Sequence, residues 1–284
     1  MAEITIGDLL TWEPRLSLYP AGVPSDRRRA DEELEVTWVV TVRASPPVLP
    51  SLRGGELVIV PGRTAEDTAV PLQELLREIE TRGATGIIFD HPIETPDGLV
   101  RLLADPIPVD LESDINRLLT EQRGSIYRIG TELGRVVQQA NSLGADVEQV
   151  LGAAAAYLEM DLAVIGANTE PIASSASRGG EMPPQVAAVA PRVWDGAWYG
   201  VRLAGAETLW LGPVTNERRA LARLVTDRLA VAVEAALAHA HDVRPRGDAR
   251  SIALAGLFSA AVADAGRGAT SLGLPANGIY RVAL

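Results

Sequence analysis

The sequence predicts an α/β domain with a largely parallel sheet, followed by an α+β domain whose antiparallel sheet is flanked by long helices. Strand-like and helix-like segments alternate over the first 112 of the 284 residues. Pairs of short strands follow, with a long helical segment before them and another after them. Charge changes at the same place: residues 1–112 hold 10 Arg against 20 Asp and Glu, and residues 113–284 hold 16 against 17.

The elements of the first domain follow from apolar runs and from the residues that end them. Three runs are expected to form strands: residues 36–42 (VTWVVTV), 56–60 (ELVIV) and 86–89 (GIIF). Four apolar side chains between the last two runs share one helical face: Leu72, Leu75, Leu76 and Ile79. We also expect a helix over 95–103, because Thr95 and Pro96 suit a helix start, and a strand over 107–111. Strands that alternate with helices predict parallel pairing.

The second domain is expected over residues 113–243, beginning with a long helix that Ser113 caps and that runs to about residue 140. A helix over 146–159, a hairpin of 162–165 with 171–174, a hairpin of 198–203 with 208–211, and a helix over 215–241 complete it. Residues 243–250 are expected to be a polar linker. Residues 244–284 would therefore hold this linker and the start of a third domain that ends in a strand.

Composition excludes several classes of function. The net charge of −11 opposes binding to nucleic acid, whose phosphates repel an acidic chain. With no cysteine and with Arg as its only strongly basic side chain, the chain has no thiolate, Cys-ligated zinc site or Schiff-base lysine. We expect no cofactor and no metal. No secretory signal and no apolar run of about 18 residues is visible, so we expect a cytoplasmic protein without a membrane span.

Polar residues follow two of the expected parallel strands directly. Arg63 and Thr64 come after Gly62, and Asp90 and His91 come after the 86–89 strand. Ligands of parallel sheets bind at the carboxyl ends of strands, where helix N-termini favour anions. These residues therefore predict either an anion site or, as the alternative, ordinary turns with solvated charges.

Two further patterns each have two interpretations. Aromatic residues gather in the second domain and predict either a small-molecule pocket or part of the core: Trp194, Trp198, Tyr199 and Trp210. Apolar residues of the long helix recur at heptad spacing and predict either a homodimer seam or packing on the helix's own domain: Ile126, Ile129, Leu133 and Val136.

Several motifs resemble the N-terminal domain of PucR-type transcriptional regulators, a family named for purine catabolism. They are Ile6-Gly7-Asp8-Leu9-Leu10, Trp38 within its strand, the LRGGEL block of residues 52–57, and Gly62. Residues 125–241 resemble, by layout, the GAF-type sensor domain that often follows in this family. Residues 252–282 are similar to the opening of the GGDEF-like domain that comes next, and in the family a C-terminal helix-turn-helix then binds DNA.

The resemblance implies a sensory portion of a regulator that binds a small effector, acts as a homodimer, and reaches DNA only through a helix-turn-helix outside residues 1–284. It implies ligand contacts at the matching residues Trp38, Gly54, Gly55 and Glu56, although the glycines and Glu56 also suit a tight turn. Two alternatives remain. One is a small-molecule enzyme that uses Asp90, His91 and Arg63, and the other is a ligand-free dimerisation module. The single plausible acid–base histidine favours a non-catalytic protein.

Overall fold

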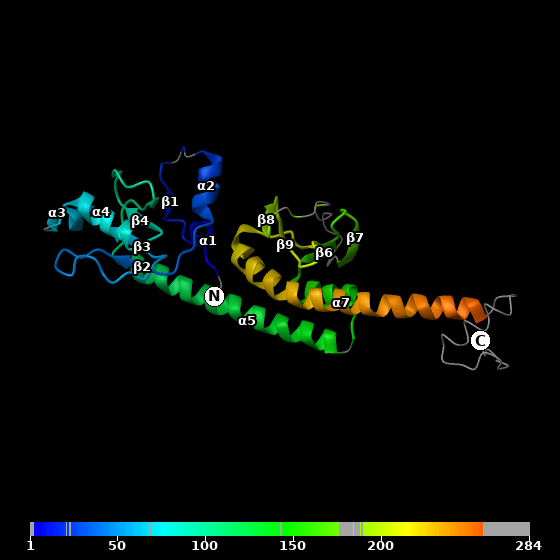
Figure 1. The fold of residues 1–284 in the computed structure, drawn as a ribbon. Helices are drawn as coiled ribbons and strands as arrows, with labels where there is room; N and C mark the ends of the chain where they lie inside the picture. Colours follow the sequence, from blue (N-terminus) through cyan, green and yellow to red (C-terminus); the bar gives the residue numbers. More distant parts are fainter. Residues whose placement is uncertain are drawn as a thin grey trace.

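The computed structural model describes residues 3–257, apart from residues 21, 23, 69, 143, 176–183, 185–187 and 189. Figure 1 shows two lobes, each built around one sheet, with the long helix α5 (Leu111–Ser142) running from the first lobe beneath the second. The third domain expected at the end of the chain, with its terminal strand, lies outside the described residues.

The first sheet is mostly parallel, as the sequence predicts. Its strands are β1 (Ser17–Leu18), β2 (Val39–Thr41), β3 (Leu57–Val60), β4 (Gly86–Phe89) and β5 (Val100–Leu103), in the order β1-β5-β4-β3-β2. Strands β2 to β5 pair in parallel, and the two-residue β1 pairs with β5 in the antiparallel sense. Helices α3 (Gly62–Asp67) and α4 (Leu72–Thr81) connect β3 to β4.

Two expectations for this domain are wrong. Residues 95–103 contain strand β5 instead of a helix, because Val100 and Leu102 are buried against the sheet, and this tertiary packing outweighs the local helix-start signal of Thr95. Residues 107–111 form no strand. Pro106 and Pro108 lack the N–H that a sheet ladder needs, and the segment turns into α5 instead.

Helices cover both faces of the first sheet. On one face lie α1 (Ile6–Trp12) and the start of α5, whose Leu111, Ile115 and Leu119 are buried in the same core cluster as Leu9. On the other face α4 buries Leu75, Leu76 and Ile79, as its spacing predicts. The first core thus extends to residue 119, past the boundary expected at 112. Ser113 is also not the N-cap, since α5 begins two residues earlier.

A buried amide fixes α5 to the edge of this sheet. The Val39 N–H donates to Asn116 Oδ1 at 2.9 Å, and Asn116 Nδ2 donates to the Val39 carbonyl at 2.8 Å. Asn116 therefore binds the outer edge of β2 as a neighbouring strand would, and it satisfies two backbone groups that no strand pairs. Two turns further along, Arg123 donates to the Val36 carbonyl at 2.7 Å.

The second sheet is antiparallel throughout. Helix α6 (Val147–Leu158) precedes β6 (Asp161–Ile165), β7 (Pro171–Ser175), β8 (Arg192–Asp195), β9 (Trp198–Arg202) and β10 (Thr208–Gly212), and the strand order is β7-β6-β10-β9-β8. Both expected hairpins, β6–β7 and β9–β10, are confirmed. Strand β8 has no counterpart among the expected elements, because its four residues carry no apolar run.

After a short turn η1 (Asn216–Arg218), helix α7 (Arg219–Leu257) runs through the segment expected to be a polar linker at 243–250. That expectation is wrong. Extending an existing helix needs no new nucleation, and the Ala and Arg residues around this segment are good helix formers.

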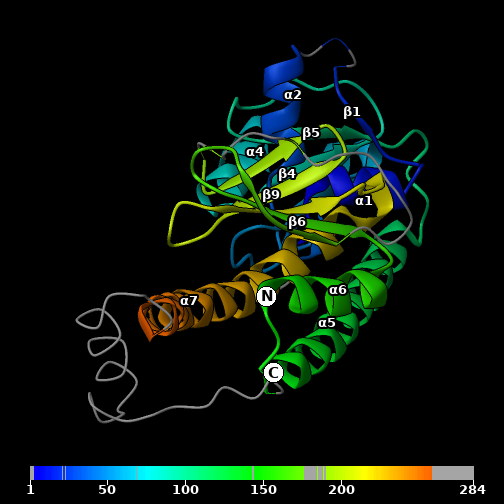
Figure 2. The same cartoon turned by 90° about the vertical axis from the view of Figure 1, so that its right-hand side faces the viewer.

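The second core lies between this sheet and three helices. Figure 2 shows α5, α6 and α7 on the same side of β6 and β9. Ile126, Leu133 and Val137 of α5 are buried there together with α6 and α7. One continuous helix therefore contributes its first turns to the first core and its later turns to the second. Among the described helices, none is both long and apolar enough to cross a membrane.

We expect Asn116→Ala to lower the free energy of unfolding by about 2 kcal/mol or more, because both Val39 backbone groups would be buried without a partner. Urea denaturation measures this change. Gln138→Ala, at an exposed position of the same helix, is the control and should change stability by less than about 0.5 kcal/mol. Equal stability of the two variants would show that the Asn116 amide does not hold the sheet edge.

Candidate functional site

A buried ion pair joins the two domains. Arg223 of α7 donates through Nη2 to Asp8 Oδ2 of α1 and to the Glu3 carbonyl, the latter at 3.2 Å. The Asp8 side chain is 0% exposed and that of Arg223 is 8% exposed. The same Asp8 oxygen accepts the Thr5 N–H at 2.8 Å, which completes the N-terminal capping box of α1. The carboxylate that starts α1 is thus also the carboxylate that holds α7.

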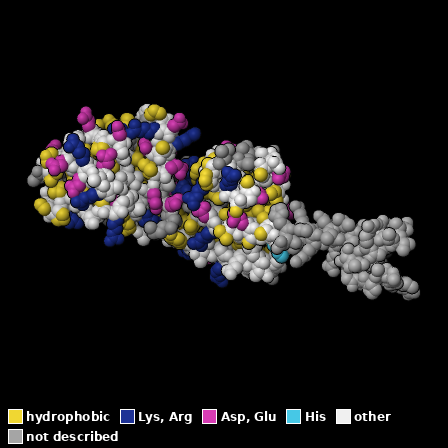
Figure 3. Space-filling view, in the orientation of Figure 1, with side chains coloured by type: hydrophobic (Ala, Val, Ile, Leu, Met, Phe, Trp, Pro, Cys, Tyr) yellow, Lys and Arg dark blue, Asp and Glu magenta, His cyan; other side chains and the backbone are white. Residues whose placement is uncertain are grey.

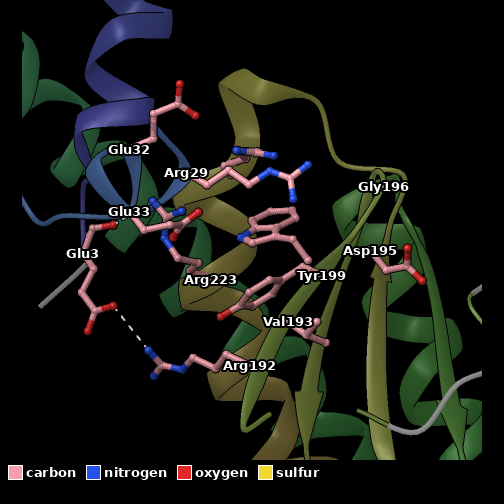
Figure 4. A pocket seen from close by; sticks show the side chains of 12 residues that line it. Glu3, Arg29, Glu32, Glu33, Arg192, Val193, Asp195, Gly196, Tyr199 and Arg223 are labelled. Carbon is pink, nitrogen blue, oxygen red and sulfur yellow. Dashed lines mark hydrogen bonds and ion pairs between the residues drawn. The ribbon is translucent and has the colours of Figure 1, made fainter. Parts of the chain in front are cut away.

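Docking through this pair leaves a cavity of about 680 Å³ between the domains, a size typical of small-molecule sites. The N-terminal segment and α2 (Ser25–Glu32), with the residue after it, form one wall, and β8, β9 and α7 form the other. Figure 3 shows charged side chains gathered where the two domains meet, and Figure 4 shows the cavity from close by. Its lining residues are Glu3, Arg29, Glu32, Glu33, Arg192, Val193, Trp194, Asp195, Gly196, Tyr199, Arg219 and Arg223.

Two aromatic rings form one side of the cavity. The ring centroids of Trp194 on β8 and Tyr199 on β9 lie 4.7 Å apart, with their planes tilted by 44°. The guanidinium carbon of Arg219, at the start of α7, lies 4.6 Å from the Trp194 ring centroid, which is cation–π distance. In the described part of the chain, neither Arg219 nor Arg29 has a carboxylate within ion-pair distance. Two guanidinium groups are therefore free for a ligand.

Arg192 carries the ion pairs of the opposite side. Its Nη1 lies 3.3 Å from Glu3 Oε2, and its Nη2 lies 2.7 Å from Asp227 Oδ2. Burial raises the pKa of Asp227, and the nearby Arg192 charge opposes that rise. Both Arg192 and Glu3 remain about half exposed, so this pair is open to exchange with solutes.

Apart from the Nε of Arg223, the Tyr199 hydroxyl is the only polar group of the cavity wall that is buried without a hydrogen-bond partner among the described residues. Figure 4 shows it pointing toward the side where Glu3, Arg192 and Arg223 lie. Burial raises the pKa of Tyr199 to about 12, so the phenol keeps its proton at neutral pH. Within the described ranges, it is a hydrogen-bond donor that lacks an acceptor.

Of the polar residues expected after the parallel strands, the structure brings Asp90 and His91 together, next to Gly62. The Gly62 N–H lies 3.2 Å from both carboxylate oxygens of Asp90, and His91 Nδ1 lies 2.6 Å from Asp90 Oδ1. Burial acts to raise the pKa of Asp90, but the hydrogen bonds from His91 and Gly62 outweigh it and lower that pKa. The anion at the start of α3 is thus the chain's own Asp90. Arg63 and Thr64 lie on α3.

The LRGGEL block closes a tight turn. Glu56 accepts the N–H groups of Arg53 at 2.7 Å and of Gly54 at 2.8 Å. Gly54 and Gly55 have φ of 100° and 84°, a region that glycine adopts without strain. A Cβ at Gly55 would lie 2.7 Å from the Thr37 side chain. Trp38 precedes the edge strand β2 and is 43% exposed. None of these residues lines the cavity between the domains.

The four aromatic residues expected to gather in the second domain lie on two faces of its sheet. Trp194 and Tyr199 line the cavity. Trp198 and Trp210 are buried together with Ile165 in a separate small cluster. Two of the four aromatic residues therefore line a pocket, and the other two belong to the core.

The chain itself covers much of the expected dimer seam. Ile126 and Leu133 are buried in the second core, whereas Ile129 and Val136 are partly buried. The homodimer stays a prediction. Of these four side chains, only Ile129 and Val136 could contact a second copy without a rearrangement of the core.

Sequence reasoning missed Asp8, Arg192 and Arg223 as site residues. A signal was present for two of them. Asp8 stands three residues after Thr5, the spacing of a capping box, and Arg223 interrupts the apolar face of α7 between buried Ala222 and Val225. A charged residue on a buried helical face requires a buried partner.

Comparisons with protein-family models, with curated proteins and with solved structures find no match to this chain. Among the described residues, no group of three His, Asp or Glu side chains is placed to hold a metal ion.

We expect Arg223→Met to lower the free energy of unfolding by about 3–5 kcal/mol, because it leaves the Asp8 carboxylate buried without its cation. Adding Asp8→Asn should restore part of this loss, since the uncompensated charge is then gone. Urea denaturation of the two single variants and the double variant measures the coupling. Arg117→Met is the control, because Arg117 pairs with Asp114 in solvent and should contribute below about 1 kcal/mol.

The raised pKa of Tyr199 has a consequence in alkaline solution. The unfolded phenol ionises near pH 10 and the folded one near pH 12, so stability is complete below about pH 10 and falls as pH rises through this window. Tyr199→Phe should remove this alkaline loss, measured as unfolding free energy against pH. Tyr157→Phe is the comparison, because a hydrogen bond to Glu132 also raises the pKa of Tyr157. If the loss of stability persists in Tyr199→Phe and disappears in Tyr157→Phe, it belongs to Tyr157 and the prediction is wrong.

Proposed function

We propose that this chain is the sensory, non-catalytic portion of a cytoplasmic PucR-type transcriptional regulator. It binds a small metabolite in the cavity between its two domains and passes the effect to a DNA-binding domain through its long helices. The observation that carries this proposal is the cavity itself. It is ligand-sized, each domain supplies one wall, and helix α7 begins at its edge.

The order of the two folds supports the family. A mostly parallel sheet comes first, and it contains the residues that resemble the PucR N-terminal domain. An antiparallel five-stranded sheet follows, packed on one face by α5, α6 and α7. This layout fits a GAF-type sensor domain.

The cavity suits binding better than proton transfer. Its lining holds four arginines, four carboxylates and two aromatic rings, and no histidine. The Tyr199 phenol keeps its proton at neutral pH because burial raises its pKa to about 12. An enzyme needs a group that exchanges protons near the working pH. The cavity wall instead offers fixed charges and stacking surfaces, which recognise a ligand without changing it.

The position of α7 supports signal transmission. Arg219 and Arg223 line the cavity from the first turns of this helix, which then continues to Leu257. The domains stay docked through Asp8 and Arg223, and a ligand that contacts both walls shifts the population toward the arrangement of the walls that fits it best. Any change in how the walls meet therefore alters the orientation of α7.

We expect at least one metabolite of a panel that includes purine-pathway compounds to raise the melting temperature of the 284-residue chain. A ligand at 100 times its Kd adds about 2.7 kcal/mol, or roughly 5–10 °C for a protein of this size. Trp194→Leu should abolish the shift, because that ring lines the cavity. Trp38→Leu is the matched control, since it removes an indole outside the cavity and should leave the shift unchanged.

Two results would contradict the proposal. One is a complete panel without a shift. The other is an equal shift in both tryptophan variants, which would place the ligand outside the cavity.

A further inference from the structure

The Glu3 carboxylate occupies a position that a ligand can take. It lies 3.3 Å from Arg192 at the edge of the cavity, and the two side chains are 51% and 46% exposed. Exposed ion pairs contribute little to stability, so this contact is easily exchanged. Arg192 keeps a second carboxylate, Asp227, at 2.7 Å whether or not Glu3 is present. Glu3 can therefore leave without unpairing the arginine.

The Tyr199 hydroxyl provides a second, independent observation. The residue is 2% exposed, its hydroxyl oxygen has no partner in the described part of the chain, and the hydroxyl points toward Glu3, Arg192 and Arg223 (Figure 4). Buried hydroxyls in folded proteins are normally hydrogen-bonded. A donor of this kind in a cavity wall indicates that the acceptor comes from a ligand.

The neighbouring surface indicates the rest of the ligand. The Trp194 ring lines the cavity next to Tyr199, and Arg219 lies over its face. Among the other acidic lining residues, Glu32 pairs with Arg28 at 2.9 Å, and Glu33 and Asp195 are exposed to solvent. Glu3 is thus the acidic lining residue whose carboxylate pairs with an arginine of the cavity wall, Arg192.

We propose that the cavity binds a small aromatic carboxylate, whose carboxylate replaces that of Glu3 on Arg192 and accepts a hydrogen bond from Tyr199. The ring of the ligand lies against Trp194. This inference rests on the proposed sensory function and adds its ligand class. It also assigns Glu3 a regulatory role, because a built-in competitor sets the ligand concentration at which the sensor responds.

Isothermal titration calorimetry of the 284-residue chain with three probes of equal size tests the ligand class. Benzoate carries both features, benzamide lacks the charge, and cyclohexanecarboxylate lacks the aromatic ring. We expect benzoate to bind at least tenfold more tightly than either of the others. Equal affinity for benzoate and benzamide would overturn the carboxylate assignment, and equal affinity for benzoate and cyclohexanecarboxylate would overturn the aromatic one.

Variants of the cavity test the exchange. Glu3→Gln should tighten benzoate binding about threefold, because a weakly held competing carboxylate is gone, and Glu121→Gln, which changes an exposed carboxylate on α5, should leave it unchanged. An unchanged affinity in Glu3→Gln would show that Glu3 does not occupy the ligand position. Arg192→Gln should abolish binding, and a retained affinity would overturn the site.

Tyr199→Phe separates a ligand contact from a structural role. The variant should bind benzoate about tenfold more weakly and should melt at the same or a higher temperature, because it removes a hydroxyl without a partner. Tyr157→Phe removes a hydroxyl that donates to Glu132 outside the cavity, and it should not change the affinity. A lower melting temperature with unchanged affinity in Tyr199→Phe would overturn the assigned hydrogen bond.

The two proposals fail in different ways. If panel metabolites stabilise the chain through Trp194 while benzoate does not bind, the sensory function stands and the ligand class is wrong. If neither benzoate nor any metabolite binds, both are wrong.

Discussion

The arrangement of the two domains depends on one buried carboxylate. Asp8 closes the capping box of α1 through Thr5 and accepts the Arg223 guanidinium of α7 at the same oxygen. Both charges are buried in the docked arrangement, so removing either one would leave the other buried without its partner, at a cost of several kcal/mol. The local fold of the N-terminus and the docking of the second domain are therefore one interaction. The cavity exists because this interaction holds its two walls in place.

Helix α5 supplies the second constraint. Its first turns are buried in the first core, where Asn116 also binds the edge strand β2, and its later turns are buried in the second core. Helices are stiff over this length, so the joint between the domains is a continuous rod beside a buried ion pair. Relative movement of the domains must bend α5 or shift α7. A signal that begins in the cavity is thus directed into the helices instead of being lost in a flexible linker.

The sequence predicted the elements that local patterns determine. Three of the parallel strands (β2, β3 and β4), helix α4 and both hairpins follow from apolar spacing, and they are present. The misses have physical causes that are not local. Strand β5 forms because it pairs with β4 in the sheet. The C-terminal part of α7 is helical because it extends a helix that has already formed. The Asp8–Arg223 contact joins residues 215 positions apart, a separation that no local pattern encodes.

The aromatic residues of the site also show which features local patterns predict and which depend on tertiary structure. Side chains alternate across a strand, so Trp198 and Tyr199 must face opposite sides of the sheet. The register pairs Tyr199 with Trp194 and pairs Gly200 with Trp210, which places Trp210 on the side of Trp198. Alternation alone could have separated Trp198 from Tyr199. Assigning Trp194 and Trp210 required the register of two hairpins, one of which includes the unpredicted strand β8.

Strong and weak charge pairs lie side by side at the cavity, and this combination suits a sensor. The Asp8–Arg223 pair is buried and holds the domains together with or without a ligand. The Glu3–Arg192 pair is half exposed and contributes little, so a small solute can displace it at modest concentration. The Glu3 backbone carbonyl also accepts a hydrogen bond from Arg223, and this contact connects the weak pair to the strong one. A ligand can therefore alter the surroundings of α7 without undocking the domains.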